Sequence, residues 1–342
     1  MLWAAARLGQ RLVWGLILVL VGGFTVVPVL LSHDVYSYVD YARLGVRHGL
    51  DPYVHPPLAT PGDPAYADVT WTEATSAYGP LFTLATYPLA WLPVAVAVAA
   101  LKAVAAFSVL GIAALTARIA TWRGVDPLRA AAFVALNPLV LVHVVGGAHN
   151  DGLTMLLAML AVAAILSARE LAGGAALVAA IAAKLSAAFL APFALLGSQR
   201  PKRTLVGALA TALSIAFIAY LAFGWDWLHG FGLAGENQSR TSHMSIPITF
   251  ARLTGTGPDG ARFAAALLFA ALVTYLLAWT WRGGDWIRAS AWAALGLLLA
   301  TAWLLPWYLI WPLPLVAISR DRPLQLLTLL LTAYQLGARI PL

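Results

Sequence analysis

The sequence contains no cysteine, and only 10% of its 342 residues are charged. Without cysteine the chain has no disulfide, no thiolate nucleophile and no cysteine-ligated metal site. Hydrophobic residues make up 61% of the chain. Soluble globular domains contain many more charged and fewer hydrophobic residues than this chain. The sequence therefore predicts an integral membrane protein whose chemistry depends on oxygen and nitrogen groups.

The chain also lacks a Walker A pattern, so nothing in the sequence indicates a site for ATP hydrolysis. Apolar runs recur along nearly its whole length and leave no room for a separate soluble domain. A helix needs roughly 20 apolar residues to cross the hydrocarbon, so about ten or eleven crossings fit. We therefore expect an all-α polytopic fold that forms a single membrane domain over residues 1–342.

The first apolar run, at residues 12–31, follows Arg7 and Arg11 as a secretory signal would. It is about twenty residues long, and no small-x-small cleavage site precedes His33, so we interpret it as an uncleaved anchor. The formal net charge of +7 is scattered over short turns rather than gathered on one face. This distribution indicates membrane topology rather than nucleic-acid binding.

Basic residues recur in short turns, which the positive-inside rule places in the cytoplasm. These turns contain Arg7, Arg11, Arg118, Arg123, Arg129, Arg169, Arg200, Lys202, Arg203, Arg282, Arg288, Arg320 and Arg322. Residues 32–92 and 224–260 then become large outer loops, the first with interfacial helices at 35–48 and 79–91. Single crossings follow at 93–121, 129–147 and 152–168, and residues 171–197 must form a hairpin of two short helices that turns near Lys184. Most acidic residues and all seven histidines fall on the outer face.

An acidic-aromatic cluster, SHDVYSYVDY at residues 32–41, directly follows the first span. In a helix, Asp34, Tyr38 and Tyr41 share one face, and Asp40 can pair with Arg43 and Arg47 on another. Asp34 could simply cap the helix by accepting its free N–H groups. It could also be a general base that takes a proton from a substrate hydroxyl, and we favour the base because a charge at the rim of the bilayer is costly.

A second polar turn, GGAHND at residues 146–151, follows a predicted span. Asn150 or Asp151 could cap the next helix. Alternatively, His149, Asn150 and Asp151 line an outer cavity and bind sugar hydroxyls. These groups could also approach His33, Asp34 and His143 to hold a metal, but no tight ligand spacing such as HExxH occurs. We therefore expect neither a metal nor a cofactor.

Isolated cations and a run of aromatic residues complete the candidate site. Lys184 at membrane depth either extends to an interface or meets an anion, and we favour an anion in the outer cavity. Arg240 would supply a second positive group for a departing phosphate, and Arg252 or Arg262 a third. The aromatic residues at 303–311 form either an interfacial belt or a surface that stacks on sugar or holds an isoprenoid tail.

The order of the motifs resembles the GT-C superfamily of glycosyltransferases that use polyprenyl-phosphate sugars. The motifs are DVYSY at 34–38, DPY at 51–53, YGP at 78–80, NPL at 137–139, GAHNDG at 147–152, Lys184 and PWY at 306–308. Within this superfamily the chain is most similar to the bacterial α-1,6-mannosyltransferases of lipomannan assembly, although it is shorter. The resemblance implies Asp34 as catalytic base, a polyprenyl-phosphate-mannose donor, an acceptor from the extracytoplasmic side, inversion at the anomeric carbon and no metal requirement.

These observations lead to one hypothesis and two alternatives. The hypothesis is an inverting glycosyltransferase of the bacterial plasma membrane that transfers a hexose, by resemblance mannose, to a glycan or glycolipid hydroxyl. Asp34 would be the base and Lys184 and Arg240 the phosphate ligands, with substrate contacts from Tyr38, Tyr78, His149, Asn150, Asp151, His243, Trp307 and Tyr308. The alternatives are a flippase for the lipid-linked sugar, without transferase chemistry, and a metal-dependent membrane hydrolase.

Overall fold

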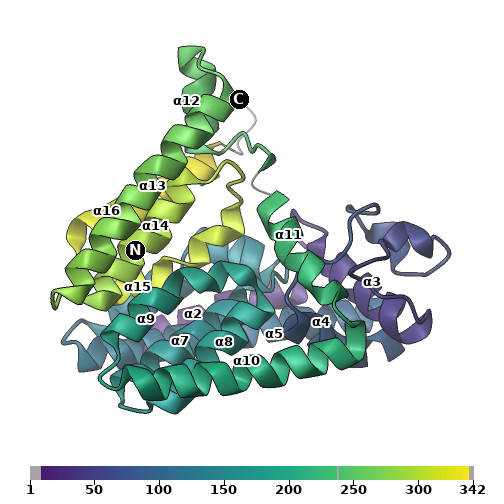
Figure 1. The fold of residues 1–342 in the computed structure, drawn as a ribbon, viewed down its shortest axis with the longest axis horizontal. Helices are drawn as coiled ribbons and strands as arrows, with labels where there is room; N and C mark the ends of the chain where they lie inside the picture. The colour runs from purple at the N-terminus through teal and green to yellow at the C-terminus, as the bar shows by residue number, and fades with distance from the viewer. Residues whose placement is uncertain (1–8, 237–238, 339–342) are drawn as a thin grey trace.

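The computed structural model describes residues 9–236 and 239–338, which form helices joined by loops, without a β-strand (Figure 1). Arg7, one of the predicted cytoplasmic charges, lies outside the described residues. Three of the helices are long and apolar enough to cross a membrane, namely α5 (Val94–Trp122), α10 (Pro201–Phe223) and α13 (Pro258–Trp281). Shorter apolar helices pack around them, so the predicted all-α membrane fold is confirmed.

The first quarter of the chain follows the predicted order of span, interfacial helix and short outer helices. Helix α2 (Gln10–Val26) precedes α3 (Asp34–Arg47), and an irregular loop leads to α4 (Pro80–Thr86) and a 3₁₀ helix (Tyr87–Trp91). Both short segments pack against α3. Each has a proline in its first turn, where the missing N–H costs nothing. The predicted helix at 35–48 is therefore confirmed within one residue at each end, and its place at the membrane interface stays a prediction.

The predicted span at residues 129–147 is wrong in one respect, because it is a broken helix. Helix α6 (Pro127–Ala135) ends before Asn137-Pro138, and a π-helical turn (Val140–Val145) replaces the rest of the span. Pro138 lacks the N–H that a continuous helix needs. The Asn137 side chain satisfies the backbone at the break, since its Oδ1 accepts from the Leu139 N–H at 3.0 Å and its Nδ2 donates to Thr332 at 3.2 Å. The irregular backbone leads directly to the polar turn ahead of α7 (Asp151–Leu166).

A helical hairpin places Lys184 at its turn, as the positions of the flanking charges predicted. Helix α8 (Glu170–Ala183) ends before Lys184, which is extended at φ −157° and ψ 127°, and a 3₁₀ helix (Leu185–Leu190) and α9 (Ala191–Gly197) follow. The start of α10 lies close against α8. A Cβ on Gly174 would be 1.9 Å from the Thr204 carbonyl oxygen, and one on Gly207 would be 2.0 Å from that of Leu171. Glycine is required at these crossings because the two backbones touch.

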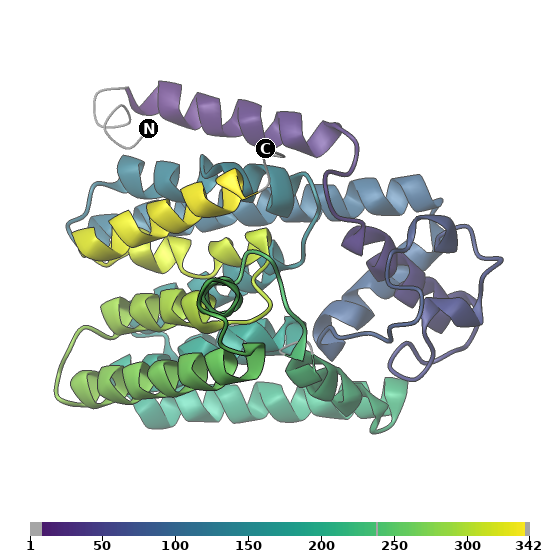
Figure 2. The same ribbon diagram turned by 90° about the horizontal axis from the view of Figure 1, so that it is seen from above.

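The last third of the chain contains α11 (His229–Glu236), α12 (Ile246–Thr254), α13, α14 (Trp286–Ala300), α15 (Leu313–Ile318) and α16 (Arg322–Gly337). Helices α12, α13, α14 and α16 rise away from the layer that contains α7, α8 and α10, and α11 lies on the other side of the opening (Figure 1). The first outer loop gathers beyond one end of the helices (Figure 2). The spacing G-x-G-x-x-G occurs at residues 230–235 and 255–260, but neither stretch follows a strand, so neither is a dinucleotide fingerprint.

Arg43 holds α3 against the outer loop, and the predicted pairing of Asp40 with Arg43 and Arg47 is wrong. Arg43 Nε donates to Asp63 Oδ1 at 2.6 Å, and Arg47 Nε donates to the Ala90 carbonyl at 2.7 Å. The Asp40 carboxyl is fully buried, and neither of its oxygens has a hydrogen-bond partner among the described residues. Burial, together with the nearby charge of Asp63, raises the pKa of Asp40 to about 7.

Replacing Asp40 with Asn is expected to stabilise the protein above pH 7. The folded state retains a proton on Asp40 between pH 3.8 and about 7, where an unfolded carboxyl has lost it, so this contribution to stability is lost as pH rises through 7. We expect the variant to melt about 2–4 °C higher than the wild type at pH 8. The difference should shrink as pH falls from 7 toward 3.8, below which the two should melt together, and the exposed Asp68→Asn is the control for the loss of one carboxylate. Equal melting at pH 8 as well would contradict the assignment.

Gly79 allows the first outer loop to touch the end of α8, next to Lys184. The Gly79 N–H donates to the Ala183 carbonyl at 3.2 Å, and a Cβ on Gly79 would be 2.0 Å from the Ala182 carbonyl oxygen. Gly79→Ala is therefore expected to force the two backbones apart and destabilise the protein by about 1–3 kcal/mol. The measurement is thermal unfolding in detergent. Gly62→Ala, in the same loop with open space around the added carbon, should unfold like the wild type.

Candidate active site

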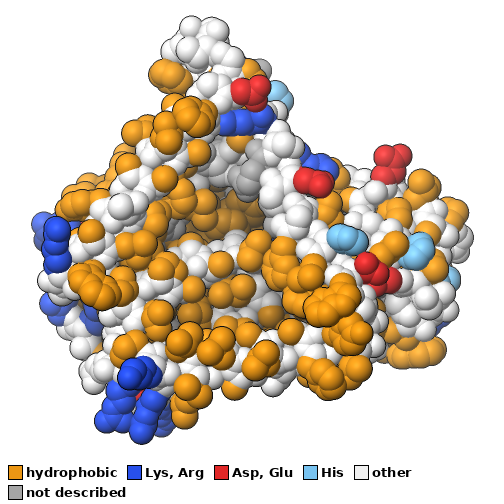
Figure 3. Space-filling model, in the orientation of Figure 1, with side chains coloured by type: hydrophobic (Ala, Val, Ile, Leu, Met, Phe, Trp, Pro, Cys, Tyr) orange, Lys and Arg blue, Asp and Glu red, His pale blue; other side chains and the backbone are white. Residues whose placement is uncertain are grey.

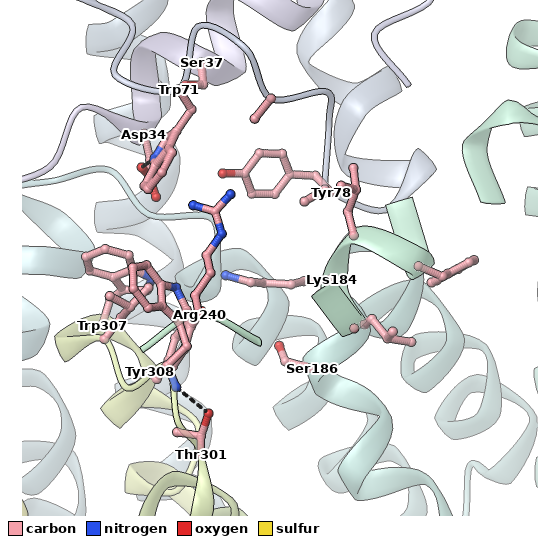
Figure 4. A pocket seen from close by; sticks show the side chains of 18 of the residues that line it. Asp34, Ser37, Trp71, Tyr78, Lys184, Ser186, Arg240, Thr301, Trp307 and Tyr308 are labelled. Carbon is pink, nitrogen blue, oxygen red and sulfur yellow. Dashed lines mark hydrogen bonds between the residues drawn. The ribbon is translucent and has the colours of Figure 1, made fainter. Parts of the chain in front are cut away.

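A cavity of about 450 Å³ opens between the first outer loop, the turn of the Lys184 hairpin and the aromatic segment at 303–311. Figure 3 shows the molecule hollowed at this position, between the rising helices and the lower layer. Six of the residues predicted for the site line the cavity: Asp34, Tyr78, Lys184, Arg240, Trp307 and Tyr308 (Figure 4). Residues separated by up to 274 positions in the sequence thus face one space.

Asp34 is the first residue of α3, and its carboxylate points into this cavity. The cap position is His33, without a side-chain capping bond, so the capping interpretation of Asp34 is wrong. Trp71 Nε1 donates to Asp34 Oδ1 at 3.2 Å, and His149 Nε2 lies 3.5 Å from Asp34 Oδ2. The side chain is 16% exposed, so it is sheltered without being sealed from the cavity. A substrate hydroxyl in the cavity could reach this carboxylate.

The electrostatic environment keeps Asp34 ionised. Burial by itself would raise the pKa of Asp34, but the hydrogen bond and positive charge of His149, the charge of Lys184 and the hydrogen bond from Trp71 outweigh it. The net result is a pKa below the ordinary value of 3.8. Asp34 is therefore a carboxylate at neutral pH and is able to accept a proton.

The polar turn before α7 is buried behind the cavity, where it contacts lining residues rather than capping the helix. Asn150 occupies the cap position without a side-chain capping bond. The fully buried Asp151 accepts from Lys184 Nζ at 2.7 Å and from Trp311 Nε1 at 2.8 Å. Asn150 Oδ1 lies 3.4 Å from the same Lys184 nitrogen. The capping interpretation of both residues is wrong, and the turn positions Lys184.

Lys184 extends from the end of α8 into the cavity, where its side chain is only 18% exposed. Its charge is matched by Asp151, and its ammonium lies 5.4 Å from the centre of the Tyr308 ring. The fixed carboxylate of Asp151 orients this ammonium. The remaining N–H capacity of Lys184 can therefore serve an anion in the cavity.

Arg240 enters the cavity from the second outer loop (Figure 4). Its guanidinium carbon lies 4.9 Å from the centre of the Trp71 ring, and Trp71 also donates to Asp34. One tryptophan thus connects the cation and the carboxylate. A guanidinium with free N–H groups can bind a phosphate in a bidentate manner.

The aromatic segment forms an internal wall rather than an interfacial belt at Trp307 and Trp311. Both indoles are more than nine-tenths buried. The Trp307 ring lies over His149 with 3.8 Å between ring centres, and the Tyr308 and Trp311 rings are stacked at 4.3 Å. The belt interpretation is therefore wrong for these two residues. Together with Trp303 and Tyr78, the wall offers apolar surface of the kind on which sugar rings stack.

Five of the predicted substrate contacts do not line the cavity, and three of them are the buried His149, Asn150 and Asp151, which contact lining residues from behind. The prediction that these three line the cavity is therefore wrong. The other two lie farther from the cavity surface. Tyr38 is buried behind it, packed edge-on against Tyr78 at 4.8 Å and Phe82 at 5.0 Å. His243 is exposed, does not line the cavity, and has its Nδ1 3.3 Å from Arg252 Nη1. The structure thus brings Asp34, the 149–151 turn, Lys184 and Arg240 together and leaves His243 apart.

The lining residues that were not among the predicted site residues include Trp71, Tyr41 and Trp311. Tyr41 lies on the same helix face as Asp34, which the helical period indicated, and its hydroxyl donates to the Ala74 carbonyl at 2.8 Å. Trp311 belonged to the aromatic run already singled out. Trp71 lies in an irregular loop, where no periodicity could have indicated its position.

Metal-ligating side chains do not gather in the described part of the chain. No group of three His, Asp or Glu side chains there is arranged to hold a metal ion. His149 and Asp34 form a pair, but the nearest further carboxylate, Asp151, is used by Lys184 and Trp311. The cavity can therefore be described by its own groups: one ionised carboxylate beside a histidine, two cations and an aromatic wall.

Comparison with known proteins gives a consistent result. Residues 1–200 match the family model described as alpha-(1->6)-mannopyranosyltransferase, N-terminal domain. Alpha-(1->6)-mannopyranosyltransferase A of Mycobacterium tuberculosis is 31% identical over 327 residues, which cover 85% of this chain and 62% of that protein. The protein of the same name from Corynebacterium glutamicum is 31% identical over 176 residues, 48% of this chain and 34% of that protein.

The chain thus spans less than two thirds of the length of these relatives. No solved structure matches it. The match to the family model covers more than half of the chain and includes Asp34, the 149–151 turn and Lys184. By this match and by its identity to the mycobacterial protein, the chain belongs to the alpha-(1->6)-mannopyranosyltransferase family.

Proposed function

We propose that this protein is an inverting glycosyltransferase that moves mannose from a polyprenyl-phosphate donor to a hydroxyl group of a glycan or glycolipid. The observation that carries the proposal is the placement of one ionised carboxylate, Asp34, across a 450 Å³ cavity from two cations, Lys184 and Arg240. Glycosyl transfer from a phosphate needs these two features, a base for the acceptor and positive charge for the leaving group. The relatives named above are mannosyltransferases, which favours mannose as the sugar.

The transfer step follows from these positions. Asp34 removes the proton of the acceptor hydroxyl as its oxygen forms a bond to the anomeric carbon. The bond from that carbon to the phosphate oxygen breaks, and its electron pair leaves with the phosphate. Lys184 and Arg240 neutralise the resulting charge. Attack opposite to the phosphate inverts the configuration, so an α-linked product requires a β-linked donor.

Charge distribution supports an extracytoplasmic cavity in the bacterial plasma membrane. Lysine and arginine gather at one end of the molecule, around the start of α10 and the turn between α13 and α14, and acidic and histidine side chains gather toward the opposite end (Figure 3). The positive-inside rule assigns the basic end to the cytoplasm. The first outer loop lies at the other end (Figure 2), and residues of this loop line the cavity. We therefore place donor and acceptor on the outer side.

A lipid-linked sugar flippase was the competing hypothesis, and the Lys184 hairpin motivated it. The site contains more than a binding surface, because a carboxylate is held beside a histidine at 3.5 Å and opens to the cavity. Movement of a lipid-linked sugar requires no base. We therefore retain the transferase as the proposed function, without a metal or cofactor.

The direct test is transfer by the purified protein in detergent or nanodiscs. Radiolabelled polyprenyl-phosphate-mannose is incubated with an α-mannoside acceptor, and the product is identified by mass spectrometry and α-mannosidase digestion. We expect an acceptor extended by one mannose. Movement of the donor across proteoliposomes without any extended acceptor would reject the transferase in favour of the flippase.

A further inference from the structure

The hydrogen bond of His149 to the backbone determines which of its nitrogens can exchange a proton. His149 Nδ1 lies 2.8 Å from the carbonyl oxygen of His143. A carbonyl oxygen only accepts, so Nδ1 must carry a hydrogen in both the neutral and the charged ring. A proton can therefore enter or leave this ring only at Nε2.

Nε2 faces the Asp34 carboxylate and has no hydrogen-bond partner elsewhere among the described residues. The His149 side chain is 1% exposed, and Trp307 covers one face of the ring. In the neutral ring the lone pair of Nε2 would therefore point at a negatively charged oxygen. Such an arrangement is favourable only with a proton between the two groups, on either nitrogen or oxygen.

We propose that Asp34 and His149 share one exchangeable proton, so that His149 Nε2 receives the proton which Asp34 removes from the acceptor hydroxyl. This inference rests on the proposed function. His149 acts through Asp34 and is a positioning and proton-storing residue rather than a substrate contact. The site residues expected from the sequence included His149 only as a sugar ligand.

The proton balance of the relay is complete without a further reactant. The acceptor O–H bond breaks, and an Asp34 oxygen takes the proton. The Asp34 O–H bond then breaks, and the Nε2 lone pair forms an N–H bond, which leaves a carboxylate beside an imidazolium. After the lipid phosphate departs, the proton returns through Asp34 to water in the cavity, and the neutral ring is restored.

The relay explains how a carboxylate with a depressed pKa can serve as a base. A charged His149 lowers the pKa of Asp34 and weakens it as a base. Nε2 can receive a proton only through its lone pair, so the relay requires a neutral ring at the start of the step. Lys184 cannot take this role, because Asp151 and Asn150 already contact its ammonium. The other charged or titratable groups around the pair are Lys184, Arg240, Asp151, Tyr38, Tyr41, Tyr78, Tyr308 and His143.

His149→Asn removes the proton relay at Nε2 but can keep the hydrogen bond to the His143 carbonyl. The Asn amide nitrogen can occupy the place of Nδ1 and keep the bond to the His143 carbonyl, but nothing replaces Nε2. We expect kcat to fall about tenfold, a part of the usual contribution of acid–base catalysis. The acid limb of the pH profile of kcat/KM should move down by about one pH unit or more, because Asp34 then titrates alone.

Trp307→Phe is the matched control for loss of packing around the ring. Its rate should fall while the acid limb stays at the wild-type pH, because the Asp34–His149 pair is intact. An acid limb at the wild-type pH in His149→Asn as well would overturn the proposal, since His149 would then be only structural.

A measurement without turnover keeps this inference separate from the transferase assignment. Nitrogen NMR of histidine-labelled protein should show one His149 nitrogen protonated at every pH and the other titrating. In Asp34→Asn the titrating nitrogen should lose its proton at lower pH, because the neighbouring carboxylate is gone. An unchanged titration would overturn the shared proton. Absence of mannose transfer with a normal NMR response would instead reject only the transferase, and with it the catalytic role of the pair.

Discussion

Asp34→Asn is expected to abolish mannose transfer almost completely. The substitution keeps the size of the side chain and can keep the hydrogen bond from Trp71, but it removes the proton acceptor. General base catalysis contributes about 10²–10⁴-fold to rate, so we expect kcat to fall by about 10³-fold. Donor affinity should change little, because the phosphate ligands are Lys184 and Arg240. The measurement is initial rate at saturating donor, with donor binding followed in parallel.

The control for Asp34→Asn is Asp259→Asn. Asp259 is an outer-loop carboxylate whose side chain is 91% exposed and pairs with Arg262 on the same helix. Asp259→Asn removes one negative charge, as Asp34→Asn does, but Asp259 does not line the cavity. The transfer rate of this variant should therefore equal that of the wild type. An Asp34→Asn protein with normal donor binding and wild-type kcat would remove Asp34 as the base.

Loss of Lys184 should give the second largest effect, on donor binding. A hydrogen bond to a charged group contributes about 1.5–3 kcal/mol, so we expect Kd for polyprenyl-phosphate-mannose to rise by about 10–150-fold. Lys184→Met alone would also leave the fully buried Asp151 carboxylate without its cation, which destabilises a protein strongly. The informative protein is therefore the double variant Lys184→Met with Asp151→Asn, in which both charges are absent.

Thermal unfolding and donor binding are both measured for the single and the double variant. The single variant should unfold at a lower temperature than the double variant, since only the single variant retains the unpaired buried charge. Both should bind the donor weakly. Arg252→Gln, an outer-loop cation outside the cavity, should bind it like the wild type. Wild-type donor affinity in the double variant would reject Lys184 as a phosphate ligand.

The local features of the fold were predictable because they depend on local patterns. An apolar run located α5 within a residue of its ends, and the flanking charges required a hairpin at Lys184. The broken helix at Asn137-Pro138 was not predicted, although Pro138 indicated a break. The apolar segment was long enough for one continuous membrane span and was therefore interpreted as a single helix. Backbone breaks inside apolar segments are satisfied by side chains such as Asn137, which hydropathy does not detect.

The partners of charged side chains were not predictable in the same way. Helical spacing placed Asp40 near Arg43 and Arg47, but Asp63 from the outer loop and the Ala90 carbonyl took the two arginines instead. A partner from another segment can approach an arginine with better geometry than a neighbour on the same helix. The capping interpretations of Asp34 and Asp151 failed for the same reason, since both carboxylates bind groups from elsewhere.

By itself, the sequence determined that this is an all-α membrane chain, that Asp34 follows the first span and that Lys184 lies at a break between two helices. Those properties depend on hydrophobic runs and on charges along the chain, which are readable residue by residue. Only the tertiary structure decided that Trp71 contacts Asp34, that Asp151 holds Lys184 and that His149 faces the carboxylate under Trp307. These contacts join segments up to 158 positions apart, and the packing of whole helices and of an irregular loop sets them.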